Sequence, residues 1–395
     1  MKVLIATWFG GGNVRPVLAT AMDLVQRGHQ VTVLTNPALR AQAQATGASF
    51  LEFGRVPAHD PRSLETDIVA AHEGRTIDET NQLVAKRLVF GTAEKICHDT
   101  MEAIDSVDPD AVIADYVLPG ALTAARAKKR TCLVVADGMY PLPYPERPRE
   151  SSVYAYLFER MTSKWLPHLN ALRRSVDCPA ILSPADLYAD ASAFLVMTYP
   201  MMSKYPPPPR TYFVGPQFVP PSSSDAVAGE RHIVLGSFST IVTPEQSFVI
   251  ANLAEALVQM GLESLIAAGS SRLASNHMQS DCVRITPFAP LEDLLPRSRL
   301  HINHAGNGTI VRTLAHGIPQ ICVPLIQDQH EYARRLEELG VAVRLGKTAS
   351  AGEYSAAISR ALDDDGLAVK AREIARCIRD QHEPARAARL VEDLV

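Results

Sequence analysis

Short apolar runs alternate with amphipathic helical segments along the first half of the chain. The runs lie at residues 3–7, 30–35, 110–114, 131–136 and 194–198. Strands that are apolar throughout are typical of parallel sheets, because helices cover both faces of such sheets. The pattern therefore predicts an α/β fold that is built from β-α-β units.

The same pattern restarts after a stretch that is rich in proline and serine. The later runs lie at residues 232–237, 264–268, 283–288, 299–303 and 320–323. The change of composition at 215–228 indicates a linker. We therefore predict two Rossmann-like domains, residues 1–218 and 228–380, followed by an amphipathic helix at 383–395.

Composition narrows the class of protein. The 395 residues suffice for two domains, and 47% hydrophobic with 21% charged residues is typical of a globular chain. A net charge of -4 argues against nucleic acid as a partner. Six scattered cysteines, no signal peptide and no apolar run of membrane-spanning length favour a cytoplasmic protein that has reduced thiols and no membrane partner.

The segment from His301 to Gly340 carries most of the candidate chemistry. A strand leads into the turn His304-Ala305-Gly306-Asn307-Gly308-Thr309, and a helix is expected at 310–316. The amides of Gly308, Thr309 and Ile310 would then lie at a helix start without intrahelical partners. Such a helix N-terminus favours an anion such as a diphosphate.

The order of residues in this segment resembles the donor-sugar signature of the UDP-glycosyltransferase superfamily. A histidine, a glycine turn with threonine, Gly-x-Pro, a short strand, proline and Asp-Gln follow one another. This family includes plant glucosyltransferases and bacterial antibiotic glycosyltransferases. The resemblance implies the GT-B fold, in which two Rossmann-like domains face a cleft and the last helix packs back on the first domain.

The resemblance also implies an activity and a set of donor-binding residues. The activity is inverting, metal-independent transfer of a sugar from an NDP-sugar to a small secondary-metabolite acceptor, without a cofactor. The acceptor would be aromatic or polyketide-like, and the proline-aromatic segment 139–148 is a candidate wall for it. The implied donor-binding residues are Ser239, Phe288, His304, Gly306, Asn307, Gly308, Thr309, Asp328 and Gln329.

Two substitutions bear on the donor. Phe238 stands where the family has a glycine beside the phosphate, which puts close backbone approach in question. Arg312 stands where plant relatives have a glutamate that binds the ribose diol. Loss of that acceptor favours dTDP over UDP, although a solvated helix arginine is an equal interpretation.

The general base is the main departure from the family pattern. The family places a His or Asp in the loop before the first helix, but this chain has Asn13 there, and an amide cannot accept a proton at neutral pH. Asp137 and Asp115 are the candidate bases, unless the acceptor is acidic enough, as a phenol is, to react almost without a base. Asp115 matches the acid that partners the family base, and it equally fits a carboxylate that caps the next helix.

Two other functions remain open on the sequence. Asn13 and Phe238 favour a catalytically silent helper or sugar-nucleotide binder, whereas an intact Asp328-Gln329 pair argues against it. A sugar-nucleotide epimerase would need acid–base residues that we do not identify. A homodimer or a helper complex is possible, and His301 and His304 are not expected to chelate a metal, because they should point to opposite faces of a strand.

Overall fold

The computed structural model describes the chain apart from residues 11, 61–76, 143–152, 219, 222–230, 240–244, 270, 272–279 and 327. Most of the candidate acceptor wall, from residue 143 to residue 148, therefore lies outside the described residues. The chain divides into two structural units. The first unit comprises Met1–Phe218 with Glu383–Val395, and the second comprises Val219–His382.

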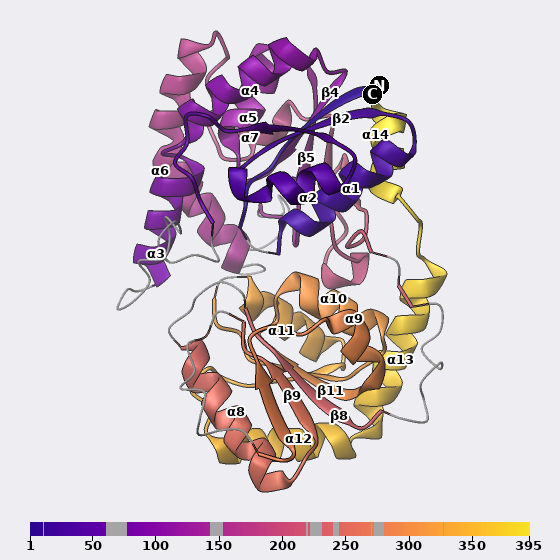
Figure 1. Cartoon of the computed structure of the whole chain (residues 1–395). Coiled ribbons are helices and arrows are strands. Elements are labelled where there is room, and N and C mark those ends of the chain that lie inside the picture. The colour runs from indigo at the N-terminus through magenta and orange to yellow at the C-terminus, as the bar shows by residue number, and fades with distance from the viewer. Residues whose placement is uncertain are drawn as a thin grey trace. The chain divides into compact units, whose positions relative to one another are not determined.

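The first unit is built on a seven-stranded parallel sheet (Figure 1). Its strand order is β3-β2-β1-β4-β5-β6-β7. The strands are β1 (Lys2–Ala6), β2 (Gln30–Thr35), β3 (Ser49–Glu52), β4 (Ala111–Asp115), β5 (Thr131–Ala136), β6 (Ala193–Val196) and β7 (Thr211–Phe213). The order reverses between β1 and β4, and ligands of open α/β sheets bind beyond the strand ends at such a point.

Eight helices accompany this sheet in the described residues. They are α1 (Val14–Gln26), α2 (Arg40–Ala45), α3 (Ile77–Val84), α4 (Ala93–Val107), α5 (Pro119–Ala127), α6 (Val153–Ser175), α7 (Asp186–Ala189) and α14 (Arg386–Leu394). 3-10 turns lie at Pro37–Leu39 and Pro200–Met202, and a π-helical turn lies at Ala85–Val89. Val3 and Ile5 face one apolar core and Leu4 and Ala6 face the other, which is why β1 is apolar throughout.

The last helix, α14, lies beside α1 in the first unit (Figure 1). Its buried face, which includes Val391, joins the core that contains Val17 of α1. Glu392 on the same helix accepts a hydrogen bond from Arg27 Nη2 at 2.5 Å and contacts His29 Nε2 at 2.7 Å. The end of the chain is therefore fixed by both apolar packing and charge.

The second unit repeats the architecture with a six-stranded parallel sheet in the order β10-β9-β8-β11-β12-β13. The strands are β8 (Ile233–Ser237), β9 (Ser264–Ala267), β10 (Val283–Thr286), β11 (Ser298–Asn303), β12 (Gln320–Cys322) and β13 (Ala342–Arg344). The helices are α8 (Gln246–Met260), α9 (Leu291–Leu294), α10 (Asn307–Ala315), α11 (Gln329–Glu338), α12 (Ala351–Asp363) and α13 (Asp365–Asp380), with a 3-10 turn at Leu295–Arg297.

The predicted α/β fold with two Rossmann-like units is confirmed. The structure differs from the prediction at one helix start that matters for the chemistry. The helix expected from residue 310 begins at Asn307, because Gly306 takes an extended conformation and acts as its N-cap. Among the described helices, none combines the length and the apolar character that a bilayer crossing requires.

Candidate active site

Three polar residues of the first unit are brought together at the carboxyl ends of neighbouring strands. Asp115 ends β4, Asp137 directly follows β5, and Asn13 follows the loop after β1. Asp115 pairs in register with Val135, so Asp137 lies two residues further along the adjacent strand. The predicted catalytic candidates thus share one site at the edge of a parallel sheet.

The two carboxyl groups have different environments. Asp115 is buried, and burial together with the charge of Asp137 raises its pKa to about 8. Burial also raises the pKa of Asp137, to about 6, although part of this residue stays exposed. At neutral pH Asp115 is therefore mainly protonated and Asp137 mainly ionised.

The contacts around Asp115 are long. Its Oδ2 accepts from Thr7 Oγ1 at 3.4 Å and from Asn13 Nδ2 at 3.5 Å. Its Oδ1 accepts from the Val117 amide at 3.3 Å. Hydrogen bonds of this length weakly stabilise a charge, which agrees with a carboxyl group that holds its proton. The Val117 amide lies ahead of α5, whose N-cap is Leu118 without a side-chain cap, so Asp115 does not cap that helix.

Asn13 has a structural task in this loop. Its Oδ1 accepts from the Gly10 amide at 3.0 Å, and its Nδ2 donates to the Trp8 carbonyl at 3.2 Å. The side chain thereby closes the loop that precedes α1. Both ends of the amide are engaged, so Asn13 positions the loop beside Asp115 and takes no part in proton transfer.

The candidate donor site of the second unit is built around the start of α10. Because this helix begins at Asn307, the amides of Thr309 and Ile310 both donate to the Gly306 carbonyl, at 3.0 Å each. The prediction that these two amides lack intrahelical partners is therefore wrong. The helix start that could receive an anion is formed by Asn307 and Gly308, earlier in the chain than predicted.

A buried side-chain relay ties this helix to the sheet. Thr313 Oγ1 donates to the Thr309 carbonyl at 2.9 Å and lies 2.7 Å from His301 Nδ1. His301 Nε2 lies 2.8 Å from Ser237 Oγ on β8. Burial holds the pKa of His301 down at about 3, so the ring is neutral. The pattern assigns the ring proton to Nδ1 and leaves Nε2 to accept from Ser237.

His304 lies against the turn that it introduces. It hydrogen-bonds to the Ser237 backbone, and burial lowers its pKa to about 4. Its Nδ1 is buried without a hydrogen-bond partner among the residues that the structure describes. A side chain on Gly306 would meet His304 Nε2 at 2.5 Å, so glycine is required there for the close approach. An unpaired buried nitrogen beside a helix start is typical of a ligand site.

The turn after β11 is held by Asn303. The Ala305 backbone has a φ of 61°, a left-handed conformation that is unfavourable for alanine. The Ala305 amide donates to Asn303 Oδ1 at 2.8 Å, and Asn303 Nδ2 donates to Gln320 Oε1 at 2.9 Å. The buried amide thus stabilises a strained turn next to His304.

The hydrogen bonds of His301 give a second reason, besides its position on the strand, why it does not bind a metal. Both of its ring nitrogens are already engaged, with Ser237 and Thr313. Across the described part of the chain, no three His, Cys, Asp or Glu side chains gather in a way that could hold a metal ion.

The loop after β8 contains the predicted donor residue Ser239. Its amide donates to Gln246 Oε1 at 3.0 Å, and its carbonyl accepts from Gln246 Nε2 at 3.0 Å. Gln246 Nε2 also reaches the Ala268 carbonyl and Ser271 Oγ, at 3.1 and 2.7 Å. Phe238 turns its side chain into the apolar core, so the ring does not occupy the ligand side of the loop.

Asp328 and Gln329 lie where α11 begins, with Asp328 as its N-cap. Gln329 is buried, and its Oε1 accepts from the amides of Leu325 and Ile326 at 2.9 and 3.1 Å. The amide NH₂ is therefore the group of Gln329 that remains for a sugar hydroxyl.

Phe288 and Arg312 complete the candidate donor site. Phe288 follows β10 and is 65% exposed, so its ring is accessible for stacking. Arg312 Nη1 donates to the Gly308 carbonyl at 2.8 Å, and Arg312 Nε lies 3.1 Å from Glu292 Oε1. The guanidinium is thus bound to the first turn of α10, which makes it more than a solvated helix arginine.

Sequence reasoning missed the residues that support these sites. Asn303, His301 and Gln246 belong to none of the motifs, and all three are fully buried. A polar residue within an otherwise apolar strand, as at His301 and Asn303, was the available signal. Gln246 at the start of an apolar helix gave no such signal.

Comparisons with known proteins agree with this geometry. Residues 251–394 match the family described as "Erythromycin biosynthesis protein CIII-like, C-terminal domain". The chain is 26% identical to 4'-demethylrebeccamycin synthase of Lentzea aerocolonigenes, over 94% of each protein. It is 25% identical to demethyllactenocin mycarosyltransferase of Streptomyces fradiae, over 97% of this chain and 84% of that protein.

The whole fold is shared with solved structures. The crystal structure of CalG4, the calicheamicin glycosyltransferase, superposes with a TM-score of 0.77. The match covers 100% of this chain and 98% of that one, at 21% sequence identity. This likeness shows the GT-B arrangement of strands and helices in both units.

Proposed function

We propose that this chain, a glycosyltransferase with the GT-B fold, transfers a sugar from a nucleoside diphosphate sugar to a small natural-product acceptor. The observation that carries the proposal is the placement of Asp115 and Asp137 at the carboxyl ends of the adjacent strands β4 and β5. Burial raises the pKa of both carboxyl groups, to about 8 for Asp115 and about 6 for Asp137, so Asp137 is the group that is ionised and available as a base at neutral pH.

Asp137 is the proposed general base. Its carboxylate takes the proton of the acceptor hydroxyl while the acceptor oxygen forms a bond to the anomeric carbon of the sugar. The bond from that carbon to the diphosphate oxygen breaks on the opposite face, so the anomeric centre inverts. Asp115 stays protonated through this step, and with Asn13 it holds the loop next to the base.

The leaving diphosphate is the proposed ligand of the second unit. Negative charge that develops on it is stabilised by the start of α10 at Asn307 and Gly308, with Thr309 contributing its hydroxyl. No metal ion is required by this scheme. Asp328 and the NH₂ group of Gln329 are the proposed partners of the sugar hydroxyls.

We further propose that the preferred nucleotide is dTDP. The Arg312 guanidinium donates to the Gly308 carbonyl and pairs with Glu292, so the side chain at position 312 offers no acceptor to a ribose diol. One structural neighbour, spinosyn rhamnosyltransferase SpnG, is solved with thymidine diphosphate and also with the spinosyn aglycone. By analogy, an aromatic or polyketide-like acceptor is proposed for this chain.

A catalytically silent helper is the competing function, because Asn13 cannot act as the family base. A measurement of turnover distinguishes an active transferase from a silent helper. The purified chain is incubated with a dTDP-sugar or a UDP-sugar and a panel of phenolic acceptors, and release of nucleoside diphosphate is measured. Transfer to an acceptor that is faster with the dTDP-sugar supports the proposal, whereas nucleotide binding without turnover on any acceptor favours the helper.

The donor site is tested by calorimetric titration with dTDP and with UDP. The parent should bind with a Kd of about 1–100 μM, and His304→Ala should weaken binding by about tenfold or more, since His304 packs on the turn and bonds to Ser237. The matched control is His98→Ala, which removes an exposed histidine from α4. If His304→Ala bound the nucleotide as tightly as His98→Ala does, the proposed donor site at the start of α10 would be wrong.

A further inference from the structure

A hollow of about 280 Å³ lies in the first unit, away from the carboxylate pair. Thr131 and Cys132 in its lining begin β5, and Ala191 precedes β6 by two residues. Asp137 follows the other end of β5, about 20 Å along the strand. The hollow therefore opens at the opposite edge of the sheet from the candidate active site.

Positive charge dominates the lining of this hollow. Four lining side chains are cationic and one is acidic: Arg126, Lys129, Arg130 and Arg173 against Asp190. Arg130 has its own partner outside the lining, Asp108, at 2.5 Å. For the other three cations, Asp190 is the one acidic residue in the lining. This local excess of positive charge contrasts with the net charge of -4 of the chain.

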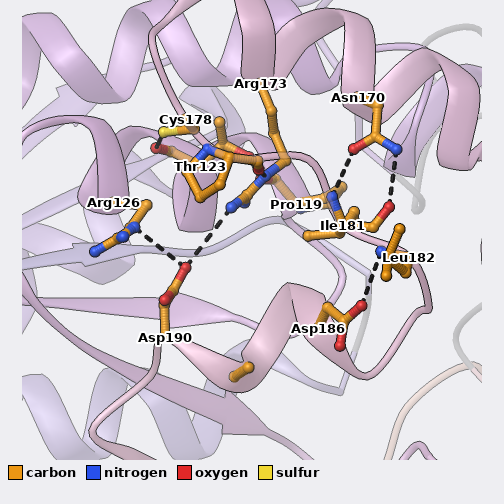
Figure 2. Close-up of polar contacts among 12 residues, drawn as sticks. Pro119, Thr123, Arg126, Asn170, Arg173, Cys178, Ile181, Leu182, Asp186 and Asp190 are labelled. Carbon is orange, nitrogen blue, oxygen red and sulfur yellow. Dashed lines mark hydrogen bonds and ion pairs between the residues drawn. The ribbon is translucent and has the colours of Figure 1, made fainter.

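Two of these cations point at the same carboxylate without closing on it (Figure 2). Arg126 Nε lies 3.3 Å and Arg173 Nη2 lies 3.6 Å from Asp190 Oδ2. Close charge-assisted pairs of this kind have distances of about 2.7–2.9 Å. Asp190 is thus too distant to satisfy either guanidinium well, and an additional anion could approach both.

Arg173 makes this site more than a surface cluster. It is only 2% exposed, and its Nε donates to the Pro179 carbonyl at 2.6 Å, which aims the guanidinium toward Asp190. A buried cation is costly unless an anion pairs with it closely. Asp186 also interacts with Arg173 through its charge, and its Oδ2 accepts from the amides of Leu182 and Ser183 at 2.8 Å each.

The C-terminal ends of two helices bring these cations to the hollow. Arg126, Lys129 and Arg130 lie at the C-terminus of α5, where cations interact favourably with the helix dipole. Arg173 lies in the last turn of another helix, α6, so its charge also interacts favourably with a helix dipole. Lys129 also has a φ of 51°, a position where helices usually end in glycine or asparagine.

We propose that this hollow binds a small ligand through a phosphate monoester group, with Arg126, Arg173 and Lys129 as the ligating residues. Two planar guanidinium groups from different helices and one lysine suit a tetrahedral dianion, which accepts hydrogen bonds from several directions. Asp190 bridges the two arginines in the free protein and competes with the ligand for them. The hollow has room for the phosphate and a small attached group.

The test is calorimetric titration of the full chain with inorganic phosphate at constant ionic strength, with chloride as the replaced salt. Arg126→Gln should weaken phosphate binding by about three- to tenfold. Asp190→Asn should tighten it several-fold, because the competing carboxylate is removed. The matched control is Arg40→Gln, which removes an exposed arginine that pairs with Glu52 in the same unit.

Opposite shifts in the Arg126 and Asp190 variants, with none in the Arg40 variant, establish the site. Phosphate held at the start of α10 would respond to none of these changes, so equal affinities in all variants overturn the proposal. Weaker binding in Asp190→Asn overturns the competitor role, and absence of phosphate binding by the parent overturns the site. Arg126 is 46% exposed in its side chain, so its variant should fold; Arg173→Gln, checked for its melting temperature, serves as the second variant.

Discussion

The two candidate sites use different means to handle charge. In the first unit, titratable carboxyl groups lie at strand ends with long hydrogen bonds, as at Asp115. In the second unit, neutral side chains with close hydrogen bonds hold a helix start and its turn, as at His301 and Asn303. The first arrangement shifts pKa values, whereas the second fixes a backbone.

This difference has a chemical reason. A group that moves a proton must change its charge, so its partners cannot stabilise one state too strongly. A site that receives a diphosphate must present dipoles that are oriented before the ligand arrives. Weak contacts around Asp115 and a saturated relay from Ser237 to Thr309 are the expected consequences.

Asp137→Asn should have the largest effect on the reaction. The amide cannot take the acceptor proton, so kcat should fall by more than about 100-fold while the Kd for the nucleotide stays within about twofold. Initial rates with saturating donor, together with calorimetric titration of dTDP, check both values. Asp105→Asn is the control, since Asp105 pairs with Lys128 on the surface of the same unit.

An Asp137 variant with parental kcat would remove Asp137 as the base. Asp115→Asn should lower kcat less, because Asp115 is mainly protonated in the parent and an amide has a similar shape. If the Asp115 variant proved the slower of the two, the roles of the carboxyl groups would be reversed.

Gln246→Ala should be the most damaging change in the second unit. The side chain bonds to Ser239 twice, to Ala268 and to Ser271, and it is fully buried. Loss of these bonds leaves buried polar groups unpaired, which should cost about 2–4 kcal/mol of unfolding free energy. The donor KM should rise as well, because the Ser239 loop is released.

Gln259→Ala on the same helix is the matched control. Gln259 is exposed and bonds to Glu255 one turn earlier, so its loss should change the unfolding free energy by less than about 0.5 kcal/mol. Thermal unfolding and donor KM are measured for both variants. A Gln246 variant with parental stability and KM would show that the loop is held by other contacts.

The sequence predicted the glycine turn between β11 and α10 because this turn demands particular residues. Gly306 must lack a side chain beside His304, and Gly317 has a φ of 64°, so glycine appears at fixed spacing. The start of α10 was misplaced because Asn307 and Gly308 are poor helix formers that context overrides. The spacing of turn residues along the sequence predicts such turns. It does not predict which side chains form hydrogen bonds across the sheet.

The carboxylate site of the first unit was less predictable, because it depends on contacts between residues that are distant in the sequence. Helix α5 and strand β5 separate Asp115 from Asp137 along the chain, and only strand order and register bring the two residues together. The pKa separation depends on burial, which the sequence does not state. The role of Asn13 as the residue that closes the Trp8–Asn13 loop likewise follows only from the folded structure.

The Asp115 environment also predicts a dependence of stability on pH. Its folded pKa, about 8, is above the ordinary value of 3.8, so folding favours the protonated form. The parent should lose stability as pH rises from about 4 to about 8, whereas Asp115→Asn has no charge to bury. The melting temperature of the variant relative to the parent should therefore increase between about pH 5 and about pH 9. A difference that stays constant with pH would contradict the raised pKa.

Phe288 should give the smallest effect and the finest test of the second unit. Its ring is 65% exposed, and in the proposed complex it stacks on the nucleotide base. Phe288→Ala should weaken dTDP binding by about two- to fivefold, and Phe288→Trp should restore or improve it, because indole offers more stacking area. Leu182→Ala is the control, since Leu182 is 89% exposed but belongs to the first unit. Calorimetric titration that ranks Trp, Phe and Ala in that order would place the base at Phe288, and equal affinities would place it elsewhere.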